Sequence, residues 1–293
     1  MKDGIITGST KCFAIIGDPV EQTLSPIIQN GGFNAAGEDA LMVGLRVSKD
    51  NLKAAIDGVR ALNIAGLSVT MPLKTEIIQY LDECDECIRY VGAVNVVTNK
   101  NGYLKGYNTD GAGFVLSMRD RNADPAGKTM LMFGAGGAAK GIAFAFLEAG
   151  ISSLVICNRS KDHALEMLSP FTEYFNTPMR IITADDAEFA DVCRASDIIM
   201  NATNMGMAGH PSPHVDWIPW ATVKSDVWIC DVVNKPIETE FITTARLHNH
   251  IVFTGDAMTL YQAKIAYRLF LGKEDVPFLG MKEALKKKME VNL

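Results

Sequence analysis

The chain alternates between short runs of β-branched and other apolar residues and longer segments whose apolar residues recur at helical spacing. In its first part, strands are predicted at residues 12–17, 41–47, 66–70, 93–98 and 103–106. Helices are predicted at residues 25–36, 50–62 and 75–90, the first with Ser25 as its N-cap before Pro26. Asn101-Gly102, between the last two strands, is a strong hairpin signal. This order predicts an α/β domain with a mixed sheet.

The second part of the chain repeats the alternation more regularly. After a connecting helix at 111–122, strands are expected at residues 130–133, 154–157, 180–183, 198–201, 227–231 and 251–253, with helices between several of them. The pattern predicts a doubly wound sheet of the Rossmann type. Two tail segments, 258–271 and 282–290, have helical spacing and are expected to return to the first domain. The predicted fold class is therefore α/β, with one domain at 1–110 and 255–293 and a second at 111–254.

A glycine-rich turn follows the first strand of the second domain. Gly134, Gly136 and Ala139 fit the spacing G-x-G-x-x-G/A, in which the second position lets a pyrophosphate approach the backbone. The helix that follows offers N–H groups and the positive end of its dipole to phosphates. A plain strand-to-helix corner also uses glycines, but a second strand after Gly150 completes a βαβ unit of the expected length and favours a nucleotide.

The segment Asn158-Arg159-Ser160 ends that second strand, where NAD-specific proteins usually place a carboxylate for the ribose hydroxyls. Arg159 offers a planar fork to a phosphate and Ser160 offers a further donor, so the sequence favours NADP. The alternative to a phosphate contact is that Arg159 is an ordinary solvated surface residue. The nearby Asp162 carboxylate could allow the protein to bind NAD as well.

Composition narrows the class of partner. The 293 residues are 48% hydrophobic and 21% charged, which suits two globular domains, and the net charge is −6. Because no block of Lys and Arg interrupts the chain, neither nucleic acid nor an anionic membrane is expected as a partner. No apolar run reaches the roughly 20 residues of a membrane span, and no signal core is visible. We expect a cytoplasmic protein, either a monomer or a homodimer, that binds small molecules.

Six cysteines are scattered through the predicted strands and helices, so we expect free thiols. Cys84 and Cys87 form a C-x-x-C motif, but no second ligand pair stands at zinc spacing, and helical spacing is the favoured interpretation. Two histidine pairs lie in a Pro-rich loop and in a polar turn. No metal site is expected.

Several spaced motifs then point to one family. They are Gly17-Asp-Pro19, Thr23-Leu-Ser-Pro26, Val69-Thr-Met-Pro-Leu-Lys74, Gly92-Ala-Val-Asn95, Asn108-Thr-Asp110, Gly134-Ala-Gly-Gly-Ala138, Asn158-Arg-Ser160, Asn201-Ala-Thr203, Asp231 with Lys235-Pro236, and Met258 with Gln262-Ala263. In this order, and over nearly its whole length, the chain resembles the shikimate and quinate dehydrogenase family. The resemblance implies a substrate domain at 1–110 and 255–293 and an NADP-binding Rossmann domain at 111–254, with NAD as a possible second cofactor.

The resemblance also implies roles for single residues. Lys74 and Asp110 would be the catalytic pair. The substrate would be bound by Thr23, Ser25, Ser68, Thr70, Asn95, Asn234 and Gln262, with Thr23 and Ser25 on its carboxylate and Asn95 and Gln262 on ring hydroxyls. The cofactor would be bound by Gly134, Ala135, Gly136, Gly137, Ala138, Asn158, Arg159, Ser160, Thr203, Val232 and Gly255.

The chemistry of alcohol oxidation agrees with this pair. A group must remove the hydroxyl proton while a hydride leaves for the nicotinamide. Lys74 can do so when it is neutral. When it is protonated it can instead stabilise the developing alkoxide, while the proton leaves through Asp110 or water. The residues alone leave both routes open.

The expected function is an NADP-dependent oxidoreductase that interconverts a cyclic hydroxy acid and its keto form, with shikimate and 3-dehydroshikimate as the lead pair. Three substrate contacts depart from the family pattern: Ser68 replaces an Asn, Thr23 replaces a Ser and Asn234 replaces a Tyr. Quinate or an aminated analogue is therefore the alternative substrate. A nucleotide-binding regulator without turnover is the alternative from another class, but the presence of both Lys74 and Asp110 favours an enzyme.

Overall fold

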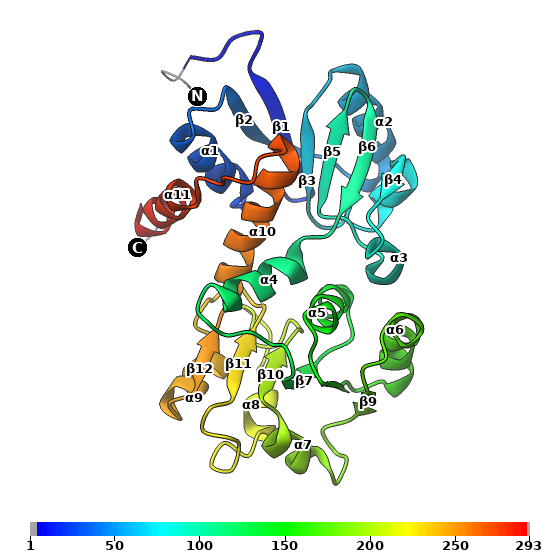
Figure 1. The fold of residues 1–293 in the computed structure, drawn as a ribbon, viewed down its shortest axis with the longest axis vertical. Coiled ribbons are helices and arrows are strands. Elements are labelled where there is room, and N and C mark those ends of the chain that lie inside the picture. Colours follow the sequence, from blue (N-terminus) through cyan, green and yellow to red (C-terminus); the bar gives the residue numbers. More distant parts are fainter. Residues whose placement is uncertain (1–4, 292–293) are drawn as a thin grey trace. The chain divides into compact units, whose positions relative to one another are not determined.

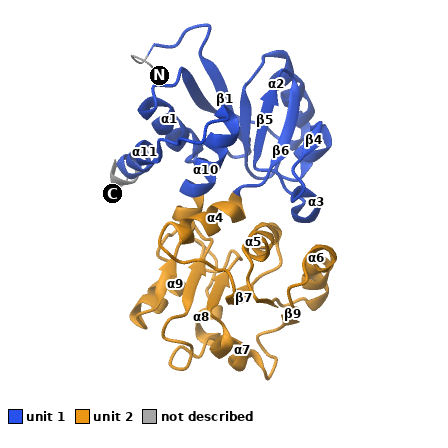
Figure 2. Cartoon of the chain, in the orientation of Figure 1, with its two compact units in different colours: residues 1–109, 260–293 blue, residues 110–259 orange. Residues whose placement is uncertain are grey.

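The computed structural model describes residues 5–291 (Figure 1). The chain divides into unit 1, residues 1–109 and 260–293, and unit 2, residues 110–259 (Figure 2). Each unit contains one six-stranded sheet, mixed in unit 1 and parallel in unit 2, which confirms the predicted α/β fold class. Residues 260–293, which contain the last helix and most of the helix before it, belong to unit 1, as expected of the tail. No helix within residues 5–291 has the length and apolar character needed to cross a membrane.

The sheet of unit 1 has the strand order β2-β1-β3-β5-β6-β4 (Figure 1). Its strands are β1 (Lys11–Gly17), β2 (Ala40–Arg46), β3 (Gly66–Val69), β4 (Glu83–Cys84), β5 (Val96–Lys100) and β6 (Tyr103–Tyr107). The helical elements are α1 (Ser25–Ala35), η2 (Lys49–Asn51), α2 (Leu52–Ala61), η3 (Glu76–Tyr80), α3 (Ile88–Val91), most of α10 (Gly255–Leu271) and α11 (Phe278–Val291). Because β5 runs antiparallel to β3 and β6, its first residue lies beside their carboxyl ends.

The sheet of unit 2 has the strand order β12-β11-β10-β7-β8-β9. Its strands are β7 (Thr129–Phe133), β8 (Ser153–Cys157), β9 (Met179–Ile182), β10 (Ile198–Asn201), β11 (Trp228–Asp231) and β12 (Ile251–Phe253). Its helices are α4 (Asp110–Arg119), α5 (Gly137–Glu148), α6 (Lys161–Tyr174), α7 (Phe189–Ala195), α8 (His214–Trp217) and α9 (Glu240–Leu247). The chain builds outward from β7 to β9 and then returns to β10 on the other side of β7. Doubly wound sheets bind ligands at such a switch point, at the carboxyl ends of the strands.

Small residues let α11 pack closely against α1, beside which it lies in Figure 1. A Cβ added at Gly31 would lie 2.4 Å from Cβ of Ala284, and one added at Gly280 would lie 2.4 Å from Cβ of Ala35. Larger side chains at these positions would force the two helices apart. The C-terminal helix is thus fitted to the N-terminal part of the chain.

The helix predicted over residues 75–90 is wrong, because the segment forms η3, β4 and α3 instead. The Asp82 N–H donates to Leu104 O at 3.0 Å, and the Asp82 carboxylate accepts from the Leu104 N–H at 2.7 Å. This pairing with β6 overrides the local helical spacing. Cys84 lies in β4 and Cys87 precedes α3, so the interpretation of C-x-x-C as helical spacing is also wrong. All six cysteines are free thiols, as expected.

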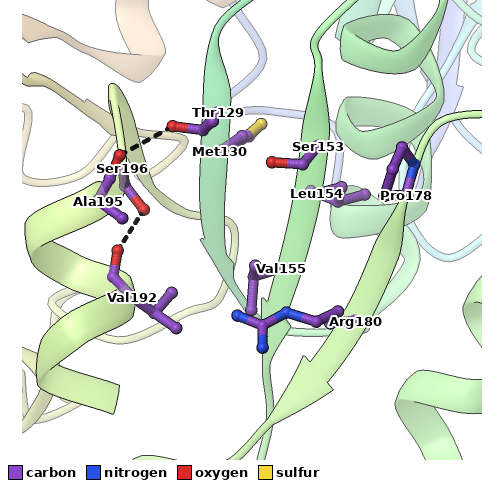
Figure 3. A pocket seen from close by; sticks show the side chains of 10 residues that line it. All are labelled: Thr129, Met130, Ser153, Leu154, Val155, Pro178, Arg180, Val192, Ala195 and Ser196. Carbon is purple, nitrogen blue, oxygen red and sulfur yellow. Dashed lines mark hydrogen bonds between the residues drawn. The ribbon is translucent and has the colours of Figure 1, made fainter. Parts of the chain in front are cut away.

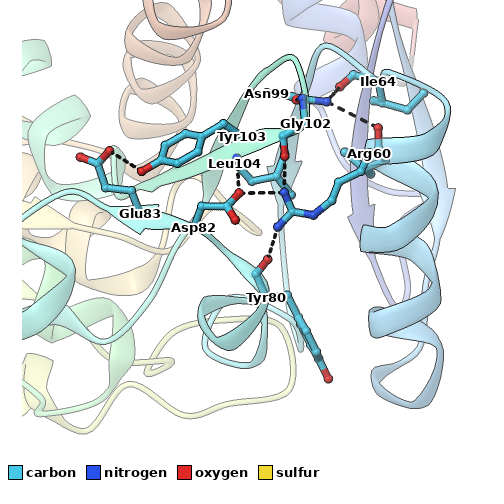
Figure 4. A network of polar contacts seen from close by, with 10 residues as sticks. Arg60, Ile64, Tyr80, Asp82, Glu83, Asn99, Gly102, Tyr103 and Leu104 are labelled. Atoms are coloured by element: carbon cyan, nitrogen blue, oxygen red, sulfur yellow. Dashed lines mark hydrogen bonds and ion pairs between the residues drawn. The ribbon is translucent and has the colours of Figure 1, made fainter.

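Arg60, on α2, holds the segment before β4 against the β5–β6 hairpin (Figure 4). Its guanidinium donates to Asp82 Oδ2 at 2.7 Å and to Tyr80 O at 2.9 Å. It also donates to Gly102 O in the hairpin turn. The Arg60 guanidinium and the Leu104 N–H hold the pKa of the Asp82 carboxyl below its usual range. One side chain thus satisfies two backbone carbonyls and a carboxylate from separate segments.

We therefore expect Arg60→Met to lower the thermal midpoint of unfolding by roughly 3–6 °C, since these acceptors lose their donor. Lys53→Met on the same helix is the control, because it breaks only the ion pair between Lys53 and Asp57. The side chains of these two residues are 70% and 61% exposed. The control should change the midpoint by about 1 °C or less. Calorimetry of the two variants compares them, and equal shifts would contradict a clamping role for Arg60.

The core of unit 2 contains a buried histidine. His214 is 0% exposed, and its ring centroid lies 4.8 Å from that of Phe241 and 5.6 Å from that of Phe133. Neither ring nitrogen has a hydrogen-bond partner within the described part of the chain. Burial lowers the pKa of His214 from 6.5 to about 4. The folded protein therefore holds this ring neutral at neutral and mildly acidic pH.

This lowered pKa predicts a loss of stability in acid. Between pH 6.5 and about 4, His214 binds a proton in the unfolded chain but not in the folded chain. The contribution of the buried neutral ring to the free energy of unfolding is therefore complete above pH 6.5 and is lost as the pH falls toward 4. His214→Phe should reduce the difference in thermal midpoint between pH 7 and pH 5. The same replacement at the exposed His163 is the control. If the thermal midpoint of His214→Phe falls between pH 7 and pH 5 by as much as that of the parent, His214 is not the cause of the acid sensitivity.

Candidate functional site

The carboxyl edge of the unit 1 sheet gathers segments that the sequence marked for substrate binding. The Val69 N–H donates to Asn95 O at 2.8 Å, and the Asn95 N–H donates to Tyr107 O at 2.9 Å. These bonds join the last residues of β3 and β6 to Asn95, the residue before β5, and so extend the ladder by one residue. Thr70, Asn95 and Asn108 therefore stand at the same edge of the sheet.

Asn95 and Gln262, 167 positions apart in the sequence, come together at this edge, with Asn95 Nδ2 at 3.4 Å from Gln262 Oε1. Thr109 contacts both residues: its N–H donates to Asn95 Oδ1 at 2.8 Å, and its Oγ1 lies 3.3 Å from Gln262 Oε1. Asn95 and Thr109 are 4% and 2% exposed. Thr109 is absent from the predicted site residues, although it stands inside the motif at 108–110. That motif was the only signal for it, since hydrogen bonding to a distant residue is not visible in a sequence.

Gln29 links α1 to the helix that carries Gln262. Its side chain lies one turn after Ser25 and donates from Nε2 to Ala263 O at 2.8 Å. The helices of two predicted substrate contacts, Ser25 and Gln262, are therefore bound to each other. Ser68, another of the predicted substrate contacts, lies in β3 and is 7% exposed.

The loop before α1 differs from its predicted form. Leu24 is the N-cap of α1, and its carbonyl accepts from the Ile28 N–H at 3.0 Å, so the N-cap lies one residue earlier than expected. The predicted N-cap role of Ser25 is therefore wrong, and the Ser25 hydroxyl does not cap the helix. The Thr23 hydroxyl donates to Val20 O at 3.0 Å.

The two predicted catalytic residues belong to different units. Lys74, in unit 1, is half-buried, and its carbonyl accepts from the Val94 N–H at 2.8 Å. Asp110 is the first residue of α4 in unit 2, where the positive end of the helix dipole stabilises a carboxylate. Their action as a pair stays a prediction.

The switch point of the unit 2 sheet brings together the loops after β7 and β10. Gly134 has a φ of 103°, which favours glycine, and an added Cβ would lie 2.6 Å from Thr203 Cγ2. The Thr203 hydroxyl donates to Asn201 Oδ1 at 2.7 Å and accepts from the Met205 N–H at 2.9 Å. Only glycine at 134 allows this contact between the loops.

The next two glycines serve a different purpose. A Cβ added at Gly136 or Gly137 would have no atom within 4 Å. The 12-residue helix α5 begins at Gly137 with no side-chain cap and no acidic residue in its first turn. Its first N–H groups thus lack a side-chain acceptor and stand at the positive end of the dipole, beside the space that the glycines leave. A dinucleotide pyrophosphate fits this turn, with Ala135 and Ala138 as its other predicted contacts.

The segment after β8 presents one cation. Arg159 is exposed and makes no ion pair with any described residue. Asn158 Nδ2 donates to Ser160 O at 2.8 Å, and Ser160 Oγ caps α6 by accepting from the His163 N–H at 3.1 Å. The side chains beside Arg159 thus shape the turn, and the guanidinium fits a phosphate on the ribose.

The predicted contacts after β11 and β12 also meet. The Val232 N–H donates to Asn201 O at 3.1 Å, and a Cβ added at Gly255 would lie 2.5 Å from Val232 O. Asn234, two residues further, is exposed, and its Oδ1 accepts from the Thr259 hydroxyl at 3.4 Å. Val232 and Gly255 therefore lie together, and Asn234 lies at the surface.

Asp231 is a buried acid behind these loops. Its Oδ1 accepts from Asn201 Nδ2 at 3.0 Å and from the Val233 N–H at 2.9 Å, and its Oδ2 accepts from the Thr239 hydroxyl at 2.7 Å. Burial raises the pKa of Asp231 to about 6, although these three donors act in the opposite direction. The network ties the ends of β10 and β11 to the start of α9.

A cavity of about 150 Å³ lies elsewhere, at the amino-terminal edge of the unit 2 sheet (Figure 3). Its lining includes Thr129 and Ser153, the first residues of β7 and β8, and Arg180 of β9. The predicted cofactor residues follow the carboxyl ends of strands of this sheet, at its opposite edge, and none of them lines this cavity.

Comparison with known proteins agrees with this arrangement. The family model for the shikimate dehydrogenase substrate binding domain matches residues 15–97, and the model for shikimate / quinate 5-dehydrogenase matches residues 118–218. A shikimate dehydrogenase (NADP⁺) of Moorella thermoacetica is 36% identical over 97% of this chain and 95% of its own length.

Two solved structures give the same result for the fold. Shikimate 5-dehydrogenase of Listeria monocytogenes, in complex with shikimate and NAD, has a TM-score of 0.89 at 30% identity and covers 96% of this chain and 98% of its own. The 5-ketofructose reductase of Gluconobacter sp. strain CHM43 has a TM-score of 0.86 at 26% identity and covers 96% and 99%. The parallel sheet and its glycine turn therefore identify the class of protein as a two-domain oxidoreductase with a Rossmann-type fold. The chain belongs to the shikimate/quinate dehydrogenase family.

The position of Arg159 predicts its effect on cofactor choice. Arg159→Ala should weaken NADP binding by roughly 10- to 100-fold, because a charge-assisted hydrogen bond is lost, and should change NAD binding by about 2-fold at most. Arg180→Ala, which removes an exposed arginine paired with Glu188 in the same unit, should leave both affinities unchanged. Dissociation constants from fluorescence titration compare the variants. Equal losses of NADP and NAD binding would contradict a phosphate contact.

Proposed function

We propose that the protein is an NADP-dependent dehydrogenase that interconverts shikimate and 3-dehydroshikimate. The observation that carries the proposal is the pairing of Asn95 with Gln262 within 3.4 Å at the carboxyl edge of the unit 1 sheet. Two neighbouring carboxamides suit a ring that carries several hydroxyls, because each amide both donates and accepts. The names of the curated relatives, shikimate dehydrogenases that use NADP, support the same substrate and cofactor.

The proposed roles extend to both units. We assign substrate binding mainly to unit 1, residues 1–109 and 260–293, and NADP binding to unit 2, residues 110–259. Substrate contacts are Thr23, Ser25, Ser68, Thr70, Asn95, Asn234 and Gln262. Cofactor contacts are Gly134, Ala135, Gly136, Gly137, Ala138, Asn158, Arg159, Ser160, Thr203, Val232 and Gly255. The protein works in the cytoplasm as a monomer or a homodimer.

Lys74 and Asp110 are the proposed catalytic residues. Bound NADP⁺ supplies the acceptor for the hydride of the secondary alcohol. Lys74 either removes the hydroxyl proton or, when protonated, stabilises the developing alkoxide. Asp110 passes the proton on to solvent. Asn95 and Gln262 hold ring hydroxyls and so orient the substrate.

The carboxylate contact falls mainly to Ser25. The Thr23 hydroxyl has a single proton and donates it to Val20 O, so it has none to offer a carboxylate in this conformation. Ser68 and Asn234, which replace the family's Asn and Tyr, are shorter side chains. Because these three substrate contacts differ from the family pattern, quinate or an aminated analogue is the alternative to shikimate as the substrate.

A panel assay tests the proposal. The purified protein is mixed with shikimate, quinate or an aminated analogue, each with NADP⁺ or NAD⁺, and reduction is followed by nicotinamide absorbance. We expect the highest kcat/KM for shikimate with NADP⁺. A higher value for another acid would replace the substrate and keep the reaction. No turnover of any acid would favour a nucleotide-binding regulator.

The catalytic pair yields a separate prediction. Lys74→Ala and Asp110→Asn should each lower kcat by roughly 10²- to 10⁴-fold, because a proton-transfer group is removed. NADP binding should stay within about 2-fold of the parent, because neither side chain is a proposed phosphate contact. Lys49→Ala, which removes an exposed lysine paired with Glu76 in unit 1, is the control and should keep its activity. Parental kcat in either test variant would show that the pair is wrongly assigned.

A further inference from the structure

We propose that Thr109 is a positioning residue, whose hydroxyl fixes the orientation of the Gln262 carboxamide beside Asn95. The inference rests on the proposed function of these two amides as contacts to ring hydroxyls. Thr109 itself is a buried side chain with neither a charge nor a redox group, and it acts through its neighbours.

The Asn95 carboxamide has only one possible orientation. The Thr109 backbone N–H lies 2.8 Å from Asn95 Oδ1, and a backbone N–H can only donate. The oxygen of the carboxamide must therefore face Thr109 N. Asn95 Nδ2 then lies 3.0 Å from Thr109 Oγ1 and donates to it.

The Thr109 hydroxyl passes this orientation on to Gln262. Because Thr109 Oγ1 accepts from Asn95, its own proton is available to an acceptor. Both acceptors of Gln262, Oε1 and the backbone O, lie 3.3 Å from Thr109 Oγ1. Asn95 Nδ2 is a second donor, at 3.4 Å from Gln262 Oε1. Asn95 Oδ1 also lies 3.3 Å from Thr109 Oγ1, but it already accepts from the Thr109 N–H. Thr109 Oγ1 and Asn95 Nδ2 are thus two donors within reach of Oε1, and both favour the orientation in which Oε1 faces inward.

The consequence concerns the other end of the Gln262 amide. With Oε1 held by Thr109 and Asn95, Nε2 is turned away from them and makes no hydrogen bond to any residue in the described part of the chain. Gln262 is thus set to donate to a substrate oxygen. Burial of Thr109 and Asn95, 2% and 4% exposed, strengthens the chain of hydrogen bonds by excluding water.

Two replacements separate the hydroxyl from the packing of the side chain. Thr109→Val keeps the shape and the backbone N–H but removes the hydroxyl, whereas Thr109→Ser keeps the hydroxyl. We expect Thr109→Val to raise KM for shikimate by about 3- to 10-fold, with KM for NADP unchanged, and Thr109→Ser to remain within about 2-fold of the parent.

A double-mutant cycle with Gln262→Ala tests whether Thr109 acts through Gln262. If it does, Thr109→Val added to Gln262→Ala raises KM by less than about 2-fold, because nothing is left to position. The full effect of Thr109→Val in that background would overturn the proposal. Equal losses in Thr109→Val and Thr109→Ser would overturn it as well, because they would indicate packing.

A spectroscopic measurement keeps this proposal separate from the identity of the substrate. The Nε2 protons of Gln262, assigned by their loss in Gln262→Ala, should give one pair of NMR resonances in the parent and in Thr109→Ser. In Thr109→Val the pair should shift or broaden as the amide samples both orientations. An unchanged pair would overturn the role of Thr109. Absence of turnover with every acid, together with a shifted pair, would instead refute the proposed function alone.

Discussion

Buried asparagine side chains at the ends of strands hold the loops that carry the proposed site. Asn95 does so in unit 1 and Asn201 in unit 2, with exposed fractions of 4% and 0%. A carboxamide donates and accepts at once, so one residue can bind two segments. Asn201 accepts from the Thr203 N–H at 3.1 Å and donates to Asp231 at 3.0 Å. Because water is excluded, these bonds define loop positions within each unit before any ligand binds.

Much of the fold could be predicted because it depends on local patterns. The strand at 198–201 and the strand at 251–253 have the predicted limits, since a short apolar run bounded by polar residues leaves little freedom. The turn at Gly134 was predictable for a similar reason. Its φ of 103° is a property that few residue types other than glycine accept, so the sequence must show it.

The parts that escaped prediction depend on contacts between distant residues. Residues 75–90 have helical spacing, but Arg60 and Leu104 bind Asp82 from outside the segment and favour β4. Thr109 resembles any small buried residue until the fold places it against Gln262, 153 positions away. The catalytic pair and the substrate contacts were implied by the family resemblance, and the glycine turn and Arg159 by motif spacing. The hydrogen bonds that orient these residues are visible only in the structure.

Transfer of a hydride from the substrate carbon to the nicotinamide is the central chemical claim, and isotopic labelling measures it most directly. Shikimate deuterated at the carbon that becomes the ketone is incubated with NADP⁺ and the protein, and the NADPH formed is analysed by mass spectrometry. The proposed function predicts NADPH that carries one deuterium, and a rate that is lower than with unlabelled shikimate when hydride transfer limits turnover. NADPH without deuterium, or no NADPH at all, would contradict it.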